Sequence, residues 1–238
     1  MKAMVLAAGS GTRMGGLTRE LPKPMLDVGG TPILGHILAN LARHGFRQVV
    51  VNLHHHGEAI EAHCGDGTRY GMAITYVHEE HLLGTAGSVR NARANFAGTG
   101  PVLVHYGDVL TDQDLGALLE THRSRAALAT LLLHRRSNSN SVVVLDAESR
   151  IVRLLERPTP EERSAVDSPW VNSGVYLLDP SVLDLIPPGT PCDFPRDIFP
   201  GLIAGGRVFG HPLEGYRCAI DSPERLEQAR REFPGIRR

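Results

Sequence analysis

The chain has 238 residues, of which 42% are hydrophobic, so it is long enough and apolar enough to bury a sizeable core. It carries 25 Lys and Arg residues against 26 Asp and Glu residues, which excludes a bulk charge that would draw it to nucleic acid or to an anionic membrane. No stretch has the length of a membrane span or the pattern of a signal peptide, so we expect a cytoplasmic protein that binds any phosphate in a local site.

Strand and helix patterns alternate through the first 135 residues. An apolar run at 2–8 ends in a glycine-rich loop, apolar residues recur at helical spacing from residue 33, and a β-branched run follows at 46–53. The alternation continues with a short helix near 58–63, a strand at 72–78, a helix at about 86–96, a buried strand at 101–107, a helix at 112–125 and a strand at 127–134. Such alternation predicts a mostly parallel, doubly wound sheet that binds its ligand at the carboxyl ends of the strands.

The pattern changes in the second half of the chain. Two β-branched runs, 141–146 and 150–156, flank a turn and predict a hairpin, and 170–179 predicts a further strand. The polar, proline-rich segment 157–169 predicts a surface loop. Together these patterns predict the α/β class, as a Rossmann-like three-layer α/β/α sandwich whose mostly parallel mixed sheet is elaborated by strands of the second half.

The first strand runs into a long glycine-rich loop, LAAGSGTRMGGLTRELPKPM at residues 6–25. A dinucleotide fingerprint would need a third glycine where Met14 stands, and a Walker A loop would need Lys23 to follow a glycine and to precede Ser or Thr. What remains is a loop whose glycine amides can approach phosphate oxygens closely, at Gly9, Gly11, Gly15 and Gly16. We therefore expect an anion-binding loop, against the alternative of a simple glycine-rich connection.

Two cations lie in this loop, Arg13 and Lys23. Lys23 stands between Pro22 and Pro24, which restrict the backbone on both sides and reduce the entropy lost when the ammonium group is aimed at one place. Of the 25 basic residues only Lys2 and Lys23 are lysines, so a lysine at this position stands out against an arginine-rich background. We predict that Lys23 is a preorganised phosphate-binding cation.

The whole loop resembles the signature of sugar-1-phosphate nucleotidylyltransferases, which join a nucleoside triphosphate to a sugar 1-phosphate and release pyrophosphate. Further motifs fit this family in order and spacing, namely LGTAGSV at 83–89, GDVL at 107–110, LLERP at 154–158, VNSGVYLLD at 171–179 and DFPRDIFPGL at 193–202. The resemblance covers nearly the whole chain. It implies one nucleotidyltransferase domain, 1–238, with a nucleotide-binding half at 1–135 and a sugar-binding half at 136–238.

The reaction of this family needs no general base, because the attacking sugar phosphate is already an anion. The reaction would be accelerated by positioning of the substrates and by neutralisation of their charge, with Mg²⁺ bridging the phosphates. By resemblance, Asp108, just past a buried strand, is the principal metal ligand, whereas a Gly-Asp pair taken alone is often a turn cap. The catalytic residues that the resemblance implies are Arg13, Lys23 and Asp108.

The family's second metal aspartate is harder to place. It lies in a pattern resembling Asp-x-Gly-Thr-Pro, whereas this chain reads AIDSPERL at 219–226. Alignment on Pro223 puts Ala219 at the aspartate position, and a turn two residues shorter makes Asp221 the ligand. We assign Asp221, whose alternative role is the N-cap of a helix that begins near Pro223.

By resemblance, the nucleotide would lie against the first loop and against Gly87, where the alternative is an ordinary helix N-terminus capped by Thr85. The residues implied in nucleotide binding are Leu6, Ala8, Gly9, Gly11, Thr12, Arg13, Lys23 and Gly87. Those implied in sugar-phosphate binding are Gly107, Glu156, Arg157, Asn172 and Gly174. Arg157 departs from the family's usual lysine, and its planar guanidinium would grip phosphate differently.

We assign no catalytic or metal-binding role to two other groups of side chains, the successive histidines and the cysteines. Three successive histidines at 54–56 do not predict zinc, because successive residues of an extended segment point to opposite faces, and we expect them to line the base pocket or to face solvent. The widely spaced cysteines fit neither a disulfide framework nor a CxxC site and predict reduced structural thiols, at Cys64, Cys192 and Cys218.

Within the family, LGTAGSV and the VNLHHH motif at 51–56 most resemble mannose- and heptose-type guanylyltransferases, which implies GTP as the donor. Uridylyl or thymidylyl transfer to another sugar 1-phosphate stays open, because a few pocket contacts decide base and sugar. A non-catalytic regulatory module that binds a nucleotide sugar is a further alternative. The implied partners are a nucleoside triphosphate and a sugar 1-phosphate, with no nucleic acid or membrane and with a homodimer left open.

Overall fold

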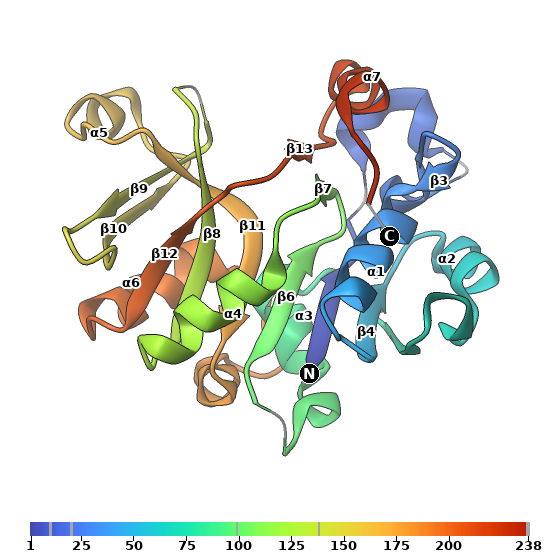
Figure 1. The fold of residues 1–238 in the computed structure, drawn as a ribbon, viewed down its shortest axis with the longest axis horizontal. Helices are drawn as coiled ribbons and strands as arrows, with labels where there is room; N and C mark the ends of the chain where they lie inside the picture. The colour runs from blue at the N-terminus through green and yellow to red at the C-terminus, as the bar shows by residue number, and fades with distance from the viewer. Residues whose placement is uncertain (10, 20, 99, 138, 237–238) are drawn as a thin grey trace.

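The computed structural model describes residues 1–9, 11–19, 21–98, 100–137 and 139–236. Within these residues nine strands form one sheet in the order β10-β9-β11-β6-β1-β4-β5, with β8 paired to β11 and β12 paired to β8 (Figure 1). The strands are β1 (Lys2–Leu6), β4 (Gln48–Leu53), β5 (Ala73–His78), β6 (Val102–Tyr106), β8 (Ala129–Arg135), β9 (Ser141–Leu145), β10 (Ile151–Glu156), β11 (Trp170–Leu178) and β12 (Val208–Pro212). Two short antiparallel pairs lie outside it, β2 (Asp27–Val28) with β3 (Thr31–Pro32) and β7 (Val109–Thr111) with β13 (Arg217–Ala219).

The centre of the sheet is parallel, as the alternating patterns predict. β5, β4, β1 and β6 run in one direction, and Leu6 at the end of β1 lies opposite both Asn52 and Tyr106. The carboxyl ends of these strands therefore meet at one edge, where ligands of such sheets bind. The strands predicted at 2–8, 46–53, 72–78 and 101–107 are confirmed, although each strand is shorter than predicted.

Strands of the second half extend the same sheet. β11 pairs antiparallel with β6 on one side and with β8 on the other, which makes the sheet mixed. The predicted hairpin is β9 with β10, and β12 adds to β8 in parallel. The prediction of a mostly parallel sheet with a β-rich elaboration is confirmed.

The segment predicted as a surface loop, 157–169, contains a short helix instead, α5 (Pro160–Ser164). Thr159 accepts a hydrogen bond from the Glu162 amide, and the Glu162 side chain accepts one from the Thr159 amide. This reciprocal capping, with proline at the first helical position, satisfies backbone donors that would otherwise need water. Most of the segment is exposed, as expected of a surface loop, but Pro160, its second proline, begins a helix that a proline-rich composition does not suggest.

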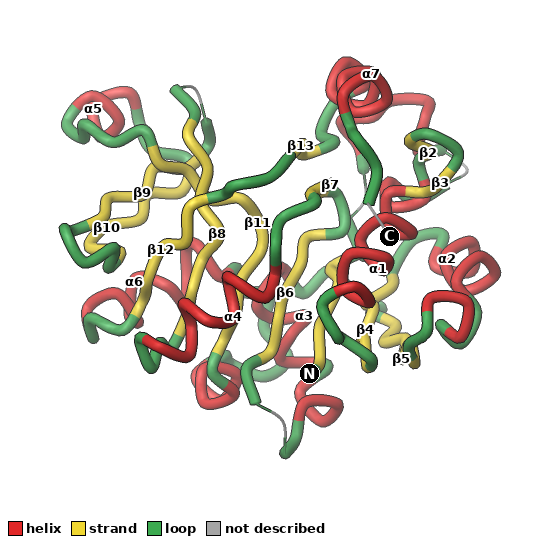
Figure 2. The backbone as a smooth tube through the Cα atoms, in the orientation of Figure 1, coloured by secondary structure: helices red, strands yellow, loops and turns green. Residues whose placement is uncertain are grey.

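Helices cover both faces of the sheet (Figure 2), and successive residues of β1 enter different cores. Ala3 and Val5 pack with one layer of helices, whereas Met4 between them packs with the other. The first layer contains α1 (Ile33–Arg43), α2 (Gly57–Cys64), α4 (Leu115–Ser124) and α7 (Pro223–Glu232), and the second contains α3 (Gly84–Asn91), η5 (Pro180–Leu185) and α6 (Phe199–Ala204). The predicted three-layer sandwich is confirmed.

Several shorter turns connect these elements, namely η1 (Thr12–Thr18), η2 (Lys23–Met25), η3 (Thr68–Tyr70), η4 (Arg93–Phe96) and η6 (Phe194–Ile198). The helix predicted at about 86–96 therefore starts earlier and splits into α3 and η4. The three cysteines are buried and free. None of the described helices is long and apolar enough to cross a membrane.

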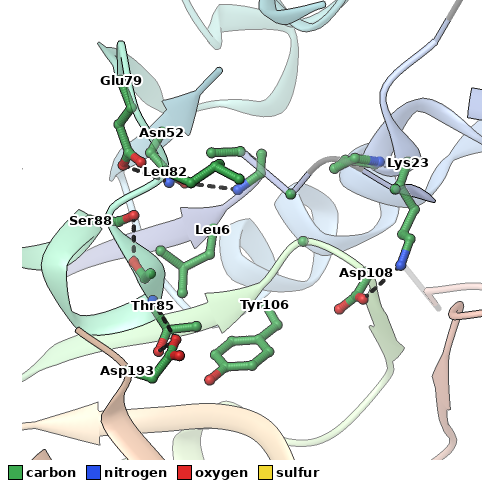
Figure 3. Close-up of a pocket in the computed structure, with 17 residues that line it drawn as sticks. Leu6, Lys23, Asn52, Glu79, Leu82, Thr85, Ser88, Tyr106, Asp108 and Asp193 are labelled. Atoms are coloured by element: carbon green, nitrogen blue, oxygen red, sulfur yellow. Dashed lines mark hydrogen bonds and ion pairs between the residues drawn. The ribbon is translucent and has the colours of Figure 1, made fainter. Parts of the chain in front are cut away.

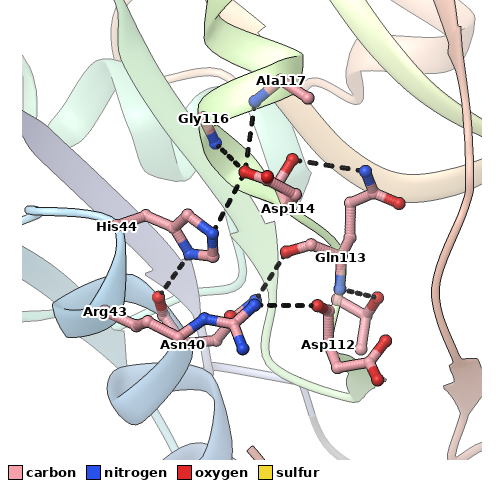
Figure 4. Close-up of polar contacts among 9 residues, drawn as sticks. Asn40, Arg43, His44, Asp112, Gln113, Asp114, Gly116 and Ala117 are labelled. Carbon is pink, nitrogen blue, oxygen red and sulfur yellow. Dashed lines mark hydrogen bonds and ion pairs between the residues drawn. The ribbon is translucent and has the colours of Figure 1, made fainter. Parts of the chain in front are cut away.

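A polar cluster ties α1 to the chain that follows β7 (Figure 4). Asn40 Nδ2 donates to the Gln113 carbonyl oxygen at 3.2 Å, and His44 Nε2 lies 3.2 Å from Asp114 Oδ1. The same Asp114 oxygen caps α4 by accepting bonds from the amides of Gly116 at 2.7 Å and Ala117 at 3.2 Å. These bonds hold β7 against α1, and β7 directly follows Asp108.

Replacing Asp114 with alanine should lower the free energy of unfolding by about 1 kcal/mol, because the first amides of α4 lose their acceptor. Urea denaturation followed by circular dichroism measures this change. The matched control is Glu120→Ala, an exposed position on the same helix that caps nothing. Equal stability of the two variants would contradict a capping role for Asp114.

Candidate active site

Two cavities open at the carboxyl ends of the parallel strands. The first, of about 280 Å³, lies between the end of β1, the glycine loop and the start of α3 (Figure 3). The second, of about 610 Å³, lies between β6, β8, β11 and the segment that contains β13. Tyr106 and Asp108 line both cavities, so a ligand in one and a ligand in the other would meet at these residues.

The glycine loop forms one wall of the first cavity. Leu6, Ala8, Gly9 and Gly11 line it, as the resemblance implied. Gly11 has φ +63°, and a Cβ there would lie 3.1 Å from the side chain of Thr18, so the tight turn requires glycine. The side chains of Thr12 and Arg13 lie outside the part of the chain that the structure describes, and their predicted roles stay predictions.

Lys23 closes the first cavity at its junction with the second. The side chain is buried, and Nζ lies 3.1 Å from Asp108 Oδ2 (Figure 3). Pro22 precedes the short turn η2 in an extended conformation and Pro24 lies inside it, so both prolines fix the backbone that presents the ammonium group. The two predicted catalytic groups with described side chains are thus in direct contact.

Asp108 projects from the sharp turn between β6 and β7. The amide of Gly107 donates to the Leu6 carbonyl oxygen at 2.9 Å, and a Cβ at Gly107 would lie only 2.6 Å from that oxygen. Any larger residue would push the turn away from β1. Glycine at 107 therefore allows Asp108 to lie at the carboxyl edge, and Gly107 itself lines the first cavity rather than the second.

At the opposite end of the first cavity lies a buried carboxylate that sequence analysis missed. Asn52, at the end of β4, accepts a bond from the Ala7 amide at 2.8 Å and donates to Glu79 Oε1 at 2.9 Å. Glu79 is only 6% exposed and lines the cavity (Figure 3). An asparagine inside the apolar run QVVVNL was the available signal, because a buried amide needs a polar partner.

The LGTAGSV motif builds the adjoining wall, although not as predicted. Thr85 does not cap α3, because its hydroxyl donates to Asp193 Oδ1 at 3.1 Å while Leu83 occupies the N-cap position. Gly87 is buried, its amide donates to the Cys192 carbonyl oxygen at 3.1 Å, and it lines neither cavity. The structure therefore brings Thr85, and not Gly87, to the predicted nucleotide site.

The second predicted metal aspartate lines the same cavity as the first. β13 pairs with β7 so that Ala219 lies opposite Val109, and the Ile220 amide donates to the Asp108 carbonyl oxygen at 2.8 Å. Asp108 and Asp221 both line the second cavity. The alternative role of Asp221 is wrong, because Ser222 caps α7 by accepting a bond from the Arg225 amide at 3.3 Å.

These residues fit a magnesium ion. Two carboxylates at one cavity edge suit Mg²⁺, which usually takes one or two carboxylates and completes its shell with substrate phosphates and water. Ala219, the other candidate position, has no ligand atom in its side chain. Among the described residues no three His, Cys, Asp or Glu side chains gather as a metal cluster.

The predicted sugar residues lie in the second cavity except for Gly107, which lines the first, and Arg157. Glu156, Asn172 and Gly174 line the second cavity. Asn172 Oδ1 accepts a hydrogen bond from the Gly174 amide at 3.0 Å, and Asn172 Nδ2 donates one to the Tyr176 hydroxyl at 2.6 Å. Burial raises the pKa of Glu156 above its ordinary value. Arg157 is exposed, has φ +53° at the end of β10 and does not line the cavity, so the structure does not bring it to the others.

Comparison with known proteins agrees with this geometry. The profile of the Nucleotidyl transferase family matches residues 2–215, which is most of the chain. The chain belongs to this family. The family that the loop signature predicted is thereby confirmed.

Two relatives and one solved structure show the range of this nucleotidyl transferase family. A mannose-1-phosphate guanylyltransferase of Mycobacterium tuberculosis is 37% identical over 226 residues, covering 93% of this chain and 61% of that protein. A UTP–glucose-1-phosphate uridylyltransferase of Synechocystis sp. is 35% identical over 223 residues, covering 88% of this chain and 57% of that protein. The structure of HddC from Yersinia pseudotuberculosis complexed with GMP-PN superposes with a TM-score of 0.80 at 20% identity, covering 98% of this chain and 99% of that one. The chain thus spans less than two thirds of the length of the two sequence relatives.

Proposed function

We propose that the protein transfers a nucleotidyl group from a nucleoside triphosphate to a sugar 1-phosphate. The observation that carries the proposal is the meeting of two cavities at Asp108, with Lys23 on the loop side and Asp221 on the other. In this proposal the half at 1–135 binds the nucleotide and the half at 136–238 binds the sugar. The lining of the cavities supports this division, because beyond residue 135 only Asp193 contributes to the first cavity.

The proposed reaction is an in-line displacement. An oxygen of the sugar phosphate attacks the α-phosphorus, the bond from that phosphorus to the bridging oxygen of the β-phosphate breaks, and pyrophosphate leaves with the electron pair. The chain supplies charge and position: Lys23 neutralises the triphosphate, and Glu156 and Asn172 hold sugar hydroxyls. Mg²⁺ held by Asp108 and Asp221 would reduce the repulsion between the two phosphates.

We assign GTP as the donor on the strength of Glu79. Guanine presents two neighbouring donors, N1–H and the N2 amino group, and a carboxylate accepts from both, whereas uracil and thymine offer one N–H between two carbonyl oxygens. Glu79 lies at the end of the first cavity away from Lys23 (Figure 3). Of the mannose- and heptose-type sugars that we propose as substrates, the name of the mannose-1-phosphate guanylyltransferase relative supports the mannose type.

Replacing Glu79 with glutamine should lower kcat/KM for GTP by about 10- to 100-fold, because the amide offers one acceptor and one donor to an edge that needs two acceptors. The value for UTP should change much less. Steady-state assays of pyrophosphate release with both nucleotides measure the ratio. Glu80→Gln is the matched control, since Glu80 is exposed and lines neither cavity. An unchanged GTP-to-UTP ratio in Glu79→Gln would contradict the base assignment.

The reaction itself is tested with purified protein and Mg²⁺ by offering GTP, UTP, dTTP, CTP and ATP against hexose and heptose 1-phosphates. Pyrophosphate release with one pair would establish the activity and identify base and sugar together. Silence across the panel, with a nucleotide sugar still bound in calorimetry, would favour the regulatory module instead. Gel filtration with light scattering determines in the same preparation whether the protein forms the homodimer that the sequence left open.

A further inference from the structure

One half-buried cation in the second cavity has no counterpart in the predicted site. Arg217 begins β13 and its side chain lines this cavity together with Asp108, Glu156 and Asn172. One terminal nitrogen donates to the Ser173 carbonyl oxygen at 3.2 Å. Its Nε atom is buried without a hydrogen-bond partner, and the guanidinium forms no ion pair with a residue that the structure describes.

Such a group is costly in the free protein. Burying a cation without a paired anion, and an N–H donor without an acceptor, loses hydration that nothing replaces. Burial lowers the pKa of Arg217 to about 10, with the Asp108 charge opposing the shift, so the guanidinium is charged at neutral pH. Burial, and then the nearby cations Arg217 and Arg136, lower the pKa of His134 to about 3. Although carboxylates also line the cavity, the Arg217 guanidinium is therefore a positive charge without an ion pair there, and an anionic ligand would supply one.

We propose that Arg217 is the cation that holds the phosphate of the sugar 1-phosphate. This assignment rests on the proposed function and adds a residue to it. Arg217 lies on the sugar side of Asp108 as Lys23 lies on the nucleotide side, so the two phosphates that react would each meet a cation next to the shared aspartate. The guanidinium fork can offer two parallel N–H donors to one phosphate group.

Other arginines near the cavity are less suited to this role. Arg163 is occupied, because its terminal nitrogens donate to the carbonyl oxygens of Val166 at 3.1 Å and Ser137 at 3.3 Å. Arg136 is exposed, and Arg157 does not line the cavity. Among these arginines, Arg217 alone combines a place in the cavity wall shared with Asp108 and a buried Nε donor without a partner.

Calorimetric titration with α-D-mannose 1-phosphate, and with inorganic phosphate as a sugar-free probe, tests the assignment without turnover. Arg217→Gln should weaken binding of the sugar phosphate by about 10- to 100-fold, because a charged hydrogen-bond donor is lost. Arg217→Lys should retain part of the affinity, and Arg153→Gln, at an exposed position of β10, should bind as the wild type. Binding of GTP should be the same in all four proteins.

Thermal unfolding separates a binding role from a structural one. If Arg217 serves the ligand, Arg217→Gln should be as stable as the wild type or more stable without ligand, since an unpaired buried charge is removed. The assignment is overturned if Arg217→Gln has a lower melting temperature together with weaker GTP binding, or if its affinity for the sugar phosphate is unchanged. It is also overturned if Arg157→Gln loses this affinity instead, or if the wild type binds neither probe. Failure of the proposed reaction would be distinct, because phosphate binding that depends on Arg217 would persist without any pyrophosphate release.

Discussion

Asp108→Asn is expected to lower kcat by about 10³-fold, because metal-assisted neutralisation of the reacting phosphates is worth several kcal/mol. Asp108 lines both cavities, and the substitution removes its negative charge while keeping its shape. The bond from the Ile220 amide survives the change, since the backbone carbonyl oxygen accepts it, whereas the buried Lys23 ammonium loses its paired anion and stability should fall. Pyrophosphate release at saturating substrates, over a range of Mg²⁺ concentrations, measures the loss.

Metal affinity distinguishes the loss of a metal ligand from a general loss of folding. Binding of Mn²⁺, followed by electron paramagnetic resonance, should weaken in Asp108→Asn, whereas circular dichroism should show the native fold with a melting temperature lowered by the loss of the Lys23 ion pair. Asp167→Asn serves as the control, because Asp167 is exposed and lines neither of the two main cavities. Wild-type turnover by Asp108→Asn would refute the metal assignment and with it the proposed meeting point of the two substrates.

Lys23→Ala is expected to lower kcat by about 10²- to 10³-fold, the usual cost of removing one preorganised electrostatic contact to a developing charge. The ammonium group is paired with Asp108 Oδ2 at 3.1 Å. When nucleotide binds, a phosphate oxygen would replace this carboxylate as its partner, and Asp108 would be released for the metal. Nucleotide affinity and kcat should therefore fall together, in calorimetry and in the pyrophosphate assay.

The chain offers a matched control for this experiment in its only other lysine. Lys2 donates to the Asn95 carbonyl oxygen at 2.6 Å and lines neither cavity. Lys2→Ala should therefore keep the kcat of the wild type. Mn²⁺ binding to Lys23→Ala should be as tight as in the wild type or tighter, because a competing cation is gone. Full activity in Lys23→Ala would undermine the phosphate role of the whole glycine loop.

Local patterns in the sequence determined most of the architecture. The alternation of apolar runs and helical spacing predicted the parallel strands and their helices, because strand and helix periodicity are properties of neighbouring residues. The glycine loop with Lys23 between two prolines predicted an anion site, because backbone freedom and restriction are also local. The reciprocal caps of α5 were equally local, at Thr159 and Glu162, and could have been predicted from the same segment.

The composition of the site depended on contacts between distant segments. Sequence could not decide between Ala219 and Asp221, whereas the pairing of β13 with β7 brings this segment alongside Asp108. Likewise, only the end of β4 explains why Glu79 is buried beside Asn52, and only the cavity lining distinguishes Arg217 from Arg157. The reason is physical: the burial of a charge and the partner that meets it are set by strands that are neighbours in the sheet, and strand order is a property of the whole chain.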